Sequence, residues 1–304
     1  MKSFPNGSRV CFVGDSITHI GMYVKHIVAY YRTHFSDLHV EFYNCGIGGG
    51  TLDNTLRVYD EDIAIHEPTH IVLMIGVNDS RSTYLSEAPS QERYQKLLAA
   101  YENYQKNLET FYELTRDRGI ELTLCTPMPY AEYQSGESAR LAGGYALLQG
   151  YANFVRAFAK ERGIALCDYH TAVARAMQTE ILYDPDRVHP NERGHFWTAS
   201  TFLAFQGIDY PQPETASEEV EQWSVISKKL RDTIGAEYAF VPNYLALDDD
   251  ARMRAIRELL EAVETKKVDL NAYQQRLLHR YVENKPHQKE YLEFVREFMK
   301  QTKG

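Results

Sequence analysis

The sequence predicts an α/β fold in which helices cover both faces of a parallel sheet. Short apolar runs alternate with longer amphipathic segments over about the first two thirds of the chain, and this alternation is typical of a doubly wound sheet. The runs are apolar almost throughout, as expected of strands buried on both faces, and their wide spacing leaves room for crossover helices. In such folds, ligands bind at the carboxyl ends of the strands.

Five apolar runs are expected to form the strands, and five amphipathic patterns are expected to form the helices. In the first pattern, Ile20, Tyr23, Val24 and Ile27 recur at spacings of three and four. The predicted strands are 10–13, 40–43, 71–75, 122–125 and 165–167, and the predicted helices are 17–35, 51–65, 90–118, 141–162 and 191–205.

Two domains are expected, with their boundary near residue 210, because Pro211 and Pro213 follow the last helix of the α/β pattern. Residues 1–210 would form the α/β domain and residues 211–304 a helical extension of mixed charge. This extension packs on the α/β domain, acts as a lid or forms an oligomer contact, and the sequence leaves these alternatives open. Its helical patterns lie at 216–234, 248–265, 269–283 and 286–301.

Composition and charge disfavour several classes of protein. The chain has 304 residues, of which 44% are hydrophobic and 25% charged, as in soluble globular proteins. A net charge of −9 disfavours nucleic acid as a partner. No run of 18 apolar residues is present, so neither a transmembrane helix nor a membrane partner is expected. The first residues contain no apolar signal-peptide region, so we expect a cytoplasmic location, although removal of a signal peptide from a precursor stays open.

The four cysteines have no spacing typical of a metal site. Each lies in or just after an apolar run, where a cysteine is most often a small buried side chain. We therefore expect buried thiols in a reducing compartment at Cys11, Cys45, Cys125 and Cys167.

A serine lies at the turn between the first strand and the first helix. Ser16 follows the apolar run 10–13 and the pair Gly14-Asp15. Its hydroxyl would lie at the carboxyl edge of the sheet, beside the unpaired N–H groups of a helix N-terminus. Such groups can stabilise the oxyanion that forms when the hydroxyl attacks a carbonyl. The alternative is that Ser16 only caps the helix, and for this stretch alone that is the more common use.

A glycine-rich loop directly follows the second strand and reads Asn44-Cys-Gly-Ile-Gly-Gly-Gly-Thr51. Its four glycines allow a sharp turn or the close approach of a ligand. A phosphate cradle is one alternative, but Thr51 replaces the third glycine of a dinucleotide fingerprint and the Walker lysine is missing. The other alternative is a loop that donates an N–H to an oxyanion.

Two further polar motifs are expected at the same edge of the sheet. Asn78, in Gly76-Val-Asn-Asp79 after the third strand, offers an N–H donor, although Asn and Asp are also common in turns. Asp186 and His189 lie three residues apart between two prolines. At this spacing the carboxylate can orient the imidazole, whose other nitrogen accepts a serine proton. Taken alone, an Asp-x-x-His pair is weak evidence.

Neither a metal site nor a cofactor is predicted. His66-Glu-Pro-Thr-His70 matches the zinc-protease pattern, which requires both histidines on one helix face. Pro68 would disrupt such a helix and His70 leads into a strand, so we interpret the match as accidental. His189 and His195 also lack a recognised ligand spacing, and His195 is expected to be a helix residue beside the site.

Taken together and in this order, the four motifs resemble the SGNH (GDSL-type) hydrolase superfamily. The matching blocks are Gly14-Asp-Ser-Ile-Thr18, Asn44-x-Gly-Ile-Gly-Gly49, Gly76-x-Asn-Asp79 and Asp186-x-x-His189, within about residues 8–205. The resemblance implies a flavodoxin-like three-layer α/β/α sandwich with a central parallel five-stranded sheet. It makes residues 1–210 the catalytic domain, and the helical extension 211–304 lies outside the family pattern.

The resemblance also implies a role for each matched residue. Ser16 would be the nucleophile, His189 the general base and Asp186 the acid that orients it. The N–H groups of Ser16 and Gly49 and the side chain of Asn78 would form the oxyanion hole.

The chain departs from the family pattern at position 50. Gly50 stands where many members carry Asp or Asn, which predicts a looser loop. Asp15 and Asp79 are expected to be structural neighbours of the site.

The resemblance implies a serine esterase that works through an acyl-enzyme. The blocks are most similar to those of bacterial carbohydrate-esterase-like members, so the expected substrate is a short-acyl ester, above all acetyl, of a small molecule or oligosaccharide. The alternatives are a lysophospholipase, an acyl thioesterase, or a non-catalytic binding protein on the same fold. A homo-oligomer would form through the C-terminal helices. The candidates for substrate contact are His19, Arg81, Tyr130 and Arg187.

Overall fold

The computed structural model describes residues 3–134 and 141–235. Of the chain's two compact units, the first is Met1–Val220 and contains the whole sheet. The second begins at Glu221, and the described part of it belongs to helix α9 (Glu218–Gly235), which confirms the helix predicted over 216–234. The helices predicted over 248–265, 269–283 and 286–301, with any lid or oligomer contact that they form, lie outside the described residues.

Five parallel strands form the sheet in the order β2-β1-β3-β4-β5. This is the order of flavodoxin-like folds, which bind their ligands where the strand order reverses, between β1 and β3. The predicted fold class and the predicted five-stranded parallel sheet are confirmed. The strands are β1 (Arg9–Gly14), β2 (Glu41–Gly46), β3 (His70–Met74), β4 (Glu121–Cys125) and β5 (Ala165–Cys167).

The carboxyl ends of the strands are level with one another. Gly14 at the end of β1 pairs with Gly46 of β2 and with Met74 of β3. Cys125 at the end of β4 pairs with Met74 and with Cys167 of β5. The segments after β1, β2 and β3, which carry the serine, glycine-rich and asparagine motifs, therefore leave the sheet at one edge.

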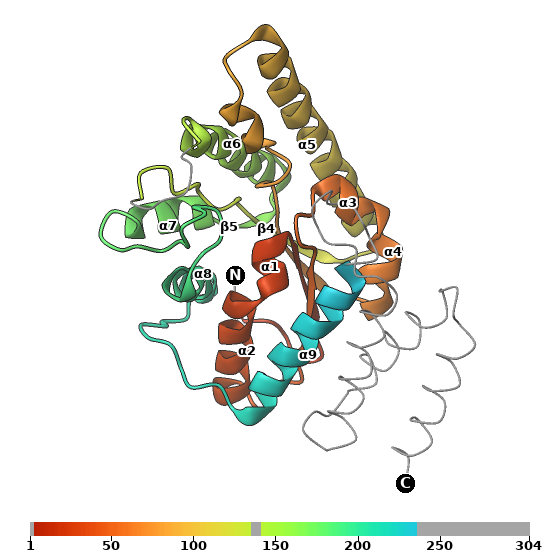
Figure 1. The fold of residues 1–304 in the computed structure, drawn as a ribbon. Coiled ribbons are helices and arrows are strands. Elements are labelled where there is room, and N and C mark those ends of the chain that lie inside the picture. The colour runs from red at the N-terminus through yellow and green to blue at the C-terminus, as the bar shows by residue number, and fades with distance from the viewer. Residues whose placement is uncertain (1–2, 135–140, 236–304) are drawn as a thin grey trace, which may run out of the picture. The chain divides into compact units, whose positions relative to one another are not determined.

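Helices cover both faces of the sheet, as right-handed crossovers require (Figure 1). On one face, α2 (Met22–His34) contacts α8 (Glu192–Phe205). On the other, α3 (Leu52–Arg57) contacts α5 (Gln91–Asp117), while α6 (Gly144–Arg162) lies against β4 and β5. The shorter elements are α1 (Ser16–Ile20), α4 (Tyr59–Asp62), η1 (Ala64–His66), η2 (Ser82–Ser86) and α7 (Tyr169–Ala176).

Aromatic side chains fill the layer between the sheet and the helices α2 and α8. The ring of Phe12 on β1 lies 6.0 Å from that of Tyr23 and 5.7 Å from that of Phe202, measured between centroids, and all three are buried. Among the residues that the structure describes, no helix is both long and apolar enough to cross a membrane. The prediction that the four cysteines are buried is confirmed for Cys11, Cys45, Cys125 and Cys167.

Two differences from the predicted helices have identifiable causes. The helix expected over 17–35 is divided at Gly21, whose φ of 76° separates α1 from α2. A Cβ at this position would lie 2.8 Å from Nδ2 of Asn44, so the glycine allows the side chain from β2 to approach. The short helix α7 was not predicted, and it begins after Asp168, whose carboxylate accepts the N–H of Thr171 at 3.2 Å.

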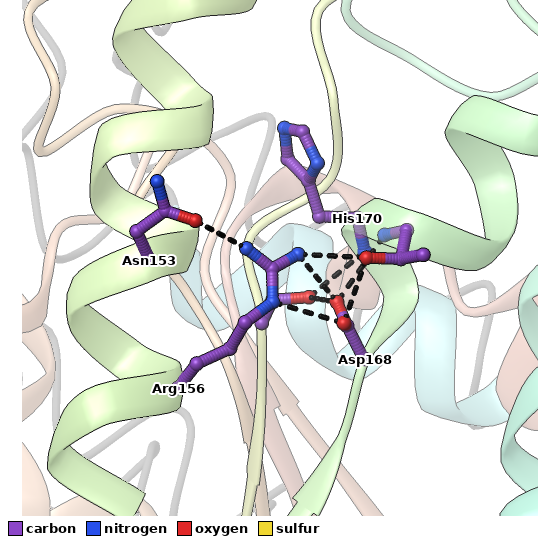
Figure 2. A network of polar contacts seen from close by, with 6 residues as sticks. Asn153, Arg156, Asp168 and His170 are labelled. Carbon is purple, nitrogen blue, oxygen red and sulfur yellow. Dashed lines mark hydrogen bonds and ion pairs between the residues drawn. The ribbon is translucent and has the colours of Figure 1, made fainter.

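Arg156 on α6 and Asp168 after β5 form the centre of a polar network (Figure 2). The guanidinium donates from Nε and Nη2 to the two carboxylate oxygens at 2.9 and 2.8 Å. The hydroxyls of Thr171 and Thr126 donate to the same carboxylate at 2.8 and 3.1 Å. Burial works to raise the pKa of Asp168, but the hydrogen bonds from Arg156 and Thr171 lower it to about 2. The network therefore joins α6, α7 and the segment after β4 through a carboxylate that is ionised at neutral pH.

Replacing Asp168 by asparagine is expected to lower the free energy of unfolding at pH 7 by about 1–2 kcal/mol, because charge-assisted hydrogen bonds are lost at a half-buried site. The lowered pKa means that this contribution is complete above the unfolded-state pKa of about 4 and is lost as the pH falls toward 2. Urea unfolding should show that the difference in free energy of unfolding between wild type and Asp168→Asn becomes smaller from pH 7 to pH 3. Asp117→Asn, which breaks the exposed pair with Arg116, is the control and should change stability little. If the two proteins are equally stable at pH 7, or if the difference in their free energy of unfolding does not change with pH, this role for the network is contradicted.

Candidate active site

Ser16 is the first residue of α1, directly after the turn that ends β1. The helix is capped by Asp15, whose Oδ1 accepts the N–H of Ile17 at 3.0 Å. The alternative that Ser16 itself is the N-cap is therefore wrong, and its hydroxyl is available for other contacts. A Cβ on Gly14 would lie 2.4 Å from the carbonyl oxygen of Met74, so the turn passes too close to β3 for any larger residue.

A chain of hydrogen bonds connects Ser16 to the loop between α7 and α8. The Oγ of Ser16 lies 2.8 Å from Nε2 of His189, and Nδ1 of the same ring lies 2.5 Å from Oδ2 of Asp186. The other carboxylate oxygen accepts the backbone N–H groups of Val188 and His189, both at 2.9 Å. The structure thus brings the three side chains of the predicted triad together in the order acid, imidazole and hydroxyl.

The carboxylate of Asp186 is stabilised in its ionised form. Partial burial works to raise its pKa, but the hydrogen bonds from the ring and backbone of His189 and from the backbone of Val188 lower the pKa below its usual value. An ionised carboxylate accepts a proton-bearing Nδ1, which leaves Nε2 as the acceptor that faces the serine hydroxyl. The arrangement therefore favours the tautomer that can take a proton from Ser16.

Three hydrogen-bond donors lie on segments that converge beside the serine. The N–H of Ser16 belongs to the first turn of α1 and has no acceptor within that helix. Gly49 has a φ of 66° in a turn that the Gly50 N–H closes onto the carbonyl of Ile47 at 2.8 Å. The side-chain Nδ2 of Asn78 donates one hydrogen to the Gly50 carbonyl at 3.0 Å and carries a second one. The predicted oxyanion donors thus come from the segments after β1, β2 and β3.

Asn44 at the end of β2 connects the glycine-rich loop to the serine helix. Its side-chain Nδ2 donates to the Thr18 carbonyl at 2.7 Å, and its Oδ1 accepts the N–H of Gly46 at 2.9 Å. A Cβ on Gly46 would lie 2.2 Å from the backbone nitrogen of His19, so only glycine allows β2 and α1 to meet there. The sequence shows Asn44 only as the first residue of the glycine-rich motif, and its place two residues before the first glycine is the one local signal of this role.

The loop at Gly50 is held at both ends, so the looser loop that the sequence predicts finds no support in its contacts. The Gly50 carbonyl accepts from Asn78, and the next residue, Thr51, caps α3 by accepting the N–H of Asn54. A Cβ on Gly50 would lie 2.9 Å from both the Cβ and the carbonyl oxygen of Ile47. An Asp or Asn at this position would therefore require a different turn.

Two buried carboxyl groups lie beneath the site, at Asp15 and Asp79. Burial raises the pKa of Asp15 to about 6, although the hydrogen bond that its carboxylate accepts from the Ile17 N–H lowers the pKa. Burial likewise raises the pKa of Asp79 to about 7, against the bond that its Oδ1 accepts from the Leu52 N–H at 2.9 Å. Both side chains bond to helix N-termini, so the contacts agree with the prediction of structural neighbours.

Of the four residues predicted to contact substrate, three are buried: His19, Tyr130 and Arg187 are 3%, 2% and 5% exposed. The hydroxyl of Tyr130 accepts the N–H of Leu141 at 3.1 Å. This burial favours structural roles for the three over direct substrate contact. Arg81 is exposed, with a φ of 52°, and stays a prediction.

Arg187 fixes the loop between the carboxylate and the imidazole from inside the protein. Its Nη1 donates to the backbone carbonyls of Glu132, at 3.3 Å, and of Gln134. Its own carbonyl accepts the N–H of Ala131 at 3.0 Å. Its φ of 66° is uncommon for a residue with a side chain. These contacts therefore hold a strained backbone in the position that brings the imidazole to Ser16.

Replacing Arg187 by alanine is expected to lower kcat for a small ester by about 10–100-fold with little change in KM, because a small shift of the imidazole is costly. Arg187→Lys retains a donor for the same carbonyls and should recover most of the loss. Steady-state kinetics on p-nitrophenyl acetate, with thermal melts to exclude unfolding, would check this. A change in KM alone, or an unchanged kcat in Arg187→Ala, would contradict a positioning role.

Within residues 3–134 and 141–235, the histidines outside this chain of hydrogen bonds do not lie in a metal-binding arrangement. His66 belongs to η1 and His70 begins β3, so the two histidines of the zinc-protease pattern do not share a helix face. His195 lies on α8 with its ring buried, and burial lowers the pKa of this ring to about 3. Among the described residues, no group of three His, Cys, Asp or Glu side chains is placed to hold a metal ion.

Comparison with known protein sequences agrees with this geometry. The model of the GDSL-like lipase/acylhydrolase family matches residues 12–196. An acetylxylan esterase from Geobacillus stearothermophilus is 25% identical over 224 residues, which are 67% of this chain and 96% of that protein.

Solved structures share the fold. A gut microbial diltiazem-metabolizing enzyme has a TM-score of 0.72 at 17% identity, covering 99% of this chain and 94% of the other. A variant of an acetyl xylan esterase from Geobacillus stearothermophilus has a TM-score of 0.58 at 24% identity, covering 69% of this chain and 99% of the other. At these identities the likeness shows a common fold.

Proposed function

We propose that the chain, which belongs to the GDSL-like lipase/acylhydrolase family and is a carboxylic ester hydrolase, removes short acyl groups, above all acetyl, from a carbohydrate. One observation supports this most strongly. The Oγ of Ser16 lies 2.8 Å from Nε2 of His189, whose Nδ1 lies 2.5 Å from Oδ2 of Asp186, and the segments that carry the predicted N–H donors leave the sheet at the same edge. Such an arrangement suits attack on an ester carbonyl, whose oxygen becomes an oxyanion.

The proposed reaction has two steps. The Oγ of Ser16 attacks the carbonyl carbon while Nε2 of His189 takes the hydroxyl proton. The oxyanion accepts from the N–H groups of Ser16 and Gly49 and from Nδ2 of Asn78. The intermediate then collapses, His189 returns the proton to the leaving sugar oxygen, and an acyl-enzyme remains. Water activated by the same imidazole releases the carboxylic acid and restores Ser16.

The carbohydrate part of the proposal depends on the relative rather than on the fold, because a fold and a motif do not determine the substrate. The relative from Geobacillus stearothermophilus is an acetylxylan esterase, and the alignment covers nearly all of that protein. The serine, glycine-rich, asparagine and histidine motifs are all intact, which disfavours a non-catalytic binding protein. A lysophospholipase or an acyl thioesterase would use the same three side chains, so only the substrate distinguishes them.

Acetate release from acetylated xylooligosaccharides tests the proposal. Wild type is expected to release acetate, and Ser16→Ala is expected to release none above background. Lysophosphatidylcholine and acetyl-coenzyme A serve as competing substrates in parallel reactions. If the enzyme acts on either of these with a higher kcat/KM than on the oligosaccharide, the proposed substrate is a lipid or a thioester instead of a carbohydrate.

A cytoplasmic location is also a proposal. It is supported by four buried cysteines, since secreted proteins more often use cysteines in disulfides. Cell fractionation followed by immunoblotting tests it, and recovery of the protein in the medium or the membrane fraction would overturn it.

A further inference from the structure

We propose that a cavity beside the catalytic loop binds a sugar unit next to the one that carries the scissile ester, an inference that depends on the proposed carbohydrate function. This cavity, called the Tyr133 cavity, has a volume of about 510 Å³. That volume lies within the range of small-molecule sites. Its walls come from the segment before residue 135, the start of α6, the end of α7 and the residues after it. They include Tyr133, Gln134, Tyr145, Met177, Gln178 and Ile181.

Exposed apolar side chains gather at this cavity. Tyr133 is 76% exposed and Ile181 is 62% exposed, and both line the cavity. In the described part of the chain, only Tyr94 and Val225 are other large hydrophobic side chains with comparable exposure. Exposed apolar side chains that gather at a cavity with a polar rim make it a candidate ligand-binding groove. A tyrosine ring, with its apolar face and polar tip, suits the apolar face and hydroxyls of a pyranose.

The polar groups of the cavity favour a neutral ligand. Gln178 carries an amide that can donate to or accept from sugar hydroxyls, and the Thr179 hydroxyl, which donates to the Ala176 carbonyl at 3.3 Å, can still accept from one. The one carboxylate in the lining, Glu180, already accepts from Nη2 of Arg193 at 3.3 Å and from Nε1 of Trp197 at 3.1 Å. None of the lining residues is Lys or Arg. An uncharged sugar therefore fits the lining better than a phosphate or a lipid head group.

Hydrogen bonds connect the cavity to the loop that carries the imidazole. Nε2 of Gln134 donates to the Tyr183 carbonyl at 2.9 Å, and its Oε1 accepts the N–H of the same residue at 3.3 Å. Nδ2 of Asn191 donates to the carbonyl of Ile181, another lining residue, at 3.0 Å. Tyr183 precedes Asp186 by three residues. A sugar held in the cavity would therefore lie beside the segment that reaches Ser16, whereas a small ester such as p-nitrophenyl acetate would not extend into it.

The test compares Tyr133→Ala and Ile181→Ser with Tyr94→Ala. Tyr94 is the matched control, because it is 58% exposed on α5 and does not line the cavity. Tyr133→Ala is expected to lower kcat/KM on acetylated xylooligosaccharides by about tenfold, as the loss of one aromatic contact predicts, and Ile181→Ser by a similar factor through the loss of apolar contact. Turnover of p-nitrophenyl acetate should stay within about twofold of wild type. Tyr94→Ala should match wild type on both substrates.

If the cavity variants lose kcat/KM equally on the oligosaccharide and on p-nitrophenyl acetate, or lose it on neither, the proposal is overturned. Binding is measured independently by titrating deacetylated xylotetraose into Ser16→Ala and into Ser16→Ala combined with Tyr133→Ala, with weaker binding expected in the second. Failure of the proposed function looks different, because wild type itself would then release no acetate from any oligosaccharide. In that case the titration still decides, and equal or undetectable binding by the two proteins would overturn the cavity as a sugar site.

Discussion

Replacing His189 by alanine is expected to lower kcat on p-nitrophenyl acetate by about 10⁴–10⁶-fold, which is the usual cost of removing the base of a serine hydrolase. The reason lies in the hydrogen bond of 2.8 Å between Nε2 and the Ser16 hydroxyl, because no other base faces that hydroxyl among the bonds described. KM should change much less than kcat. Single-turnover kinetics, with circular dichroism to confirm folding, would measure the loss.

Two further variants make this prediction sharper. Asp186→Asn keeps the size of the side chain but removes the acceptor that selects the tautomer, so a loss of about 10⁴-fold is expected. Ser16→Ala combined with His189→Ala should be no slower than either single variant, since the residues act as a unit. A His189→Ala protein that retains more than a tenth of wild-type kcat, or losses that multiply in the double variant, would contradict the assignment.

Replacing Asn78 by alanine is expected to lower kcat by about 10²–10³-fold, because one of the three proposed oxyanion donors is lost. The Asn78 amide also donates to the Gly50 carbonyl at 3.0 Å, so the variant loosens the turn that presents the Gly49 N–H. The two effects act in the same direction. Both lower kcat because both weaken the hydrogen bonds that would be made to the oxyanion in the transition state. Steady-state kinetics on p-nitrophenyl acetate measures the change.

Ser80→Ala is the matched control for Asn78. Ser80 lies in the same turn, is fully buried, and its hydroxyl donates to the Val77 carbonyl without facing the serine loop through any described bond. Its loss should cost some stability and little activity. A loss below tenfold in Asn78→Ala, or an equal loss in Ser80→Ala, would remove Asn78 from the oxyanion hole.

The parts of the fold that follow local patterns could be predicted from the sequence. The strands were predicted within a few residues of their observed ends, because they are nearly continuous apolar runs between turn residues. The triad residues Ser16, Asp186 and His189 lie up to 173 residues apart in the sequence. Their proximity was predicted from the family resemblance together with the expected edge of the sheet. The level carboxyl ends of β1, β2 and β3 explain why the serine, glycine-rich and asparagine motifs lie at one edge, whereas Asp186 and His189 reach Ser16 from the loop between α7 and α8.

The parts that depend on long-range contacts could not be predicted. A helical pattern runs on through Gly21, and only the approach of Asn44 from β2 explains the break. The sequence predicts that Arg187 contacts substrate because it adjoins the residues of a matched block. Its guanidinium instead bonds to carbonyls more than fifty residues away, and nothing in the local sequence indicates this. The exposure of Tyr133 likewise depends on the surrounding fold.

The most direct test of the central claim is the kcat/KM of wild type and Ser16→Ala on p-nitrophenyl acetate, butyrate and octanoate. A short-acyl serine esterase is expected to prefer acetate, to act weakly on octanoate, and to lose all activity above background in the variant. A preference for octanoate would assign the chain to lipid or long-chain thioester hydrolysis. Turnover that survives in Ser16→Ala would contradict the serine mechanism itself.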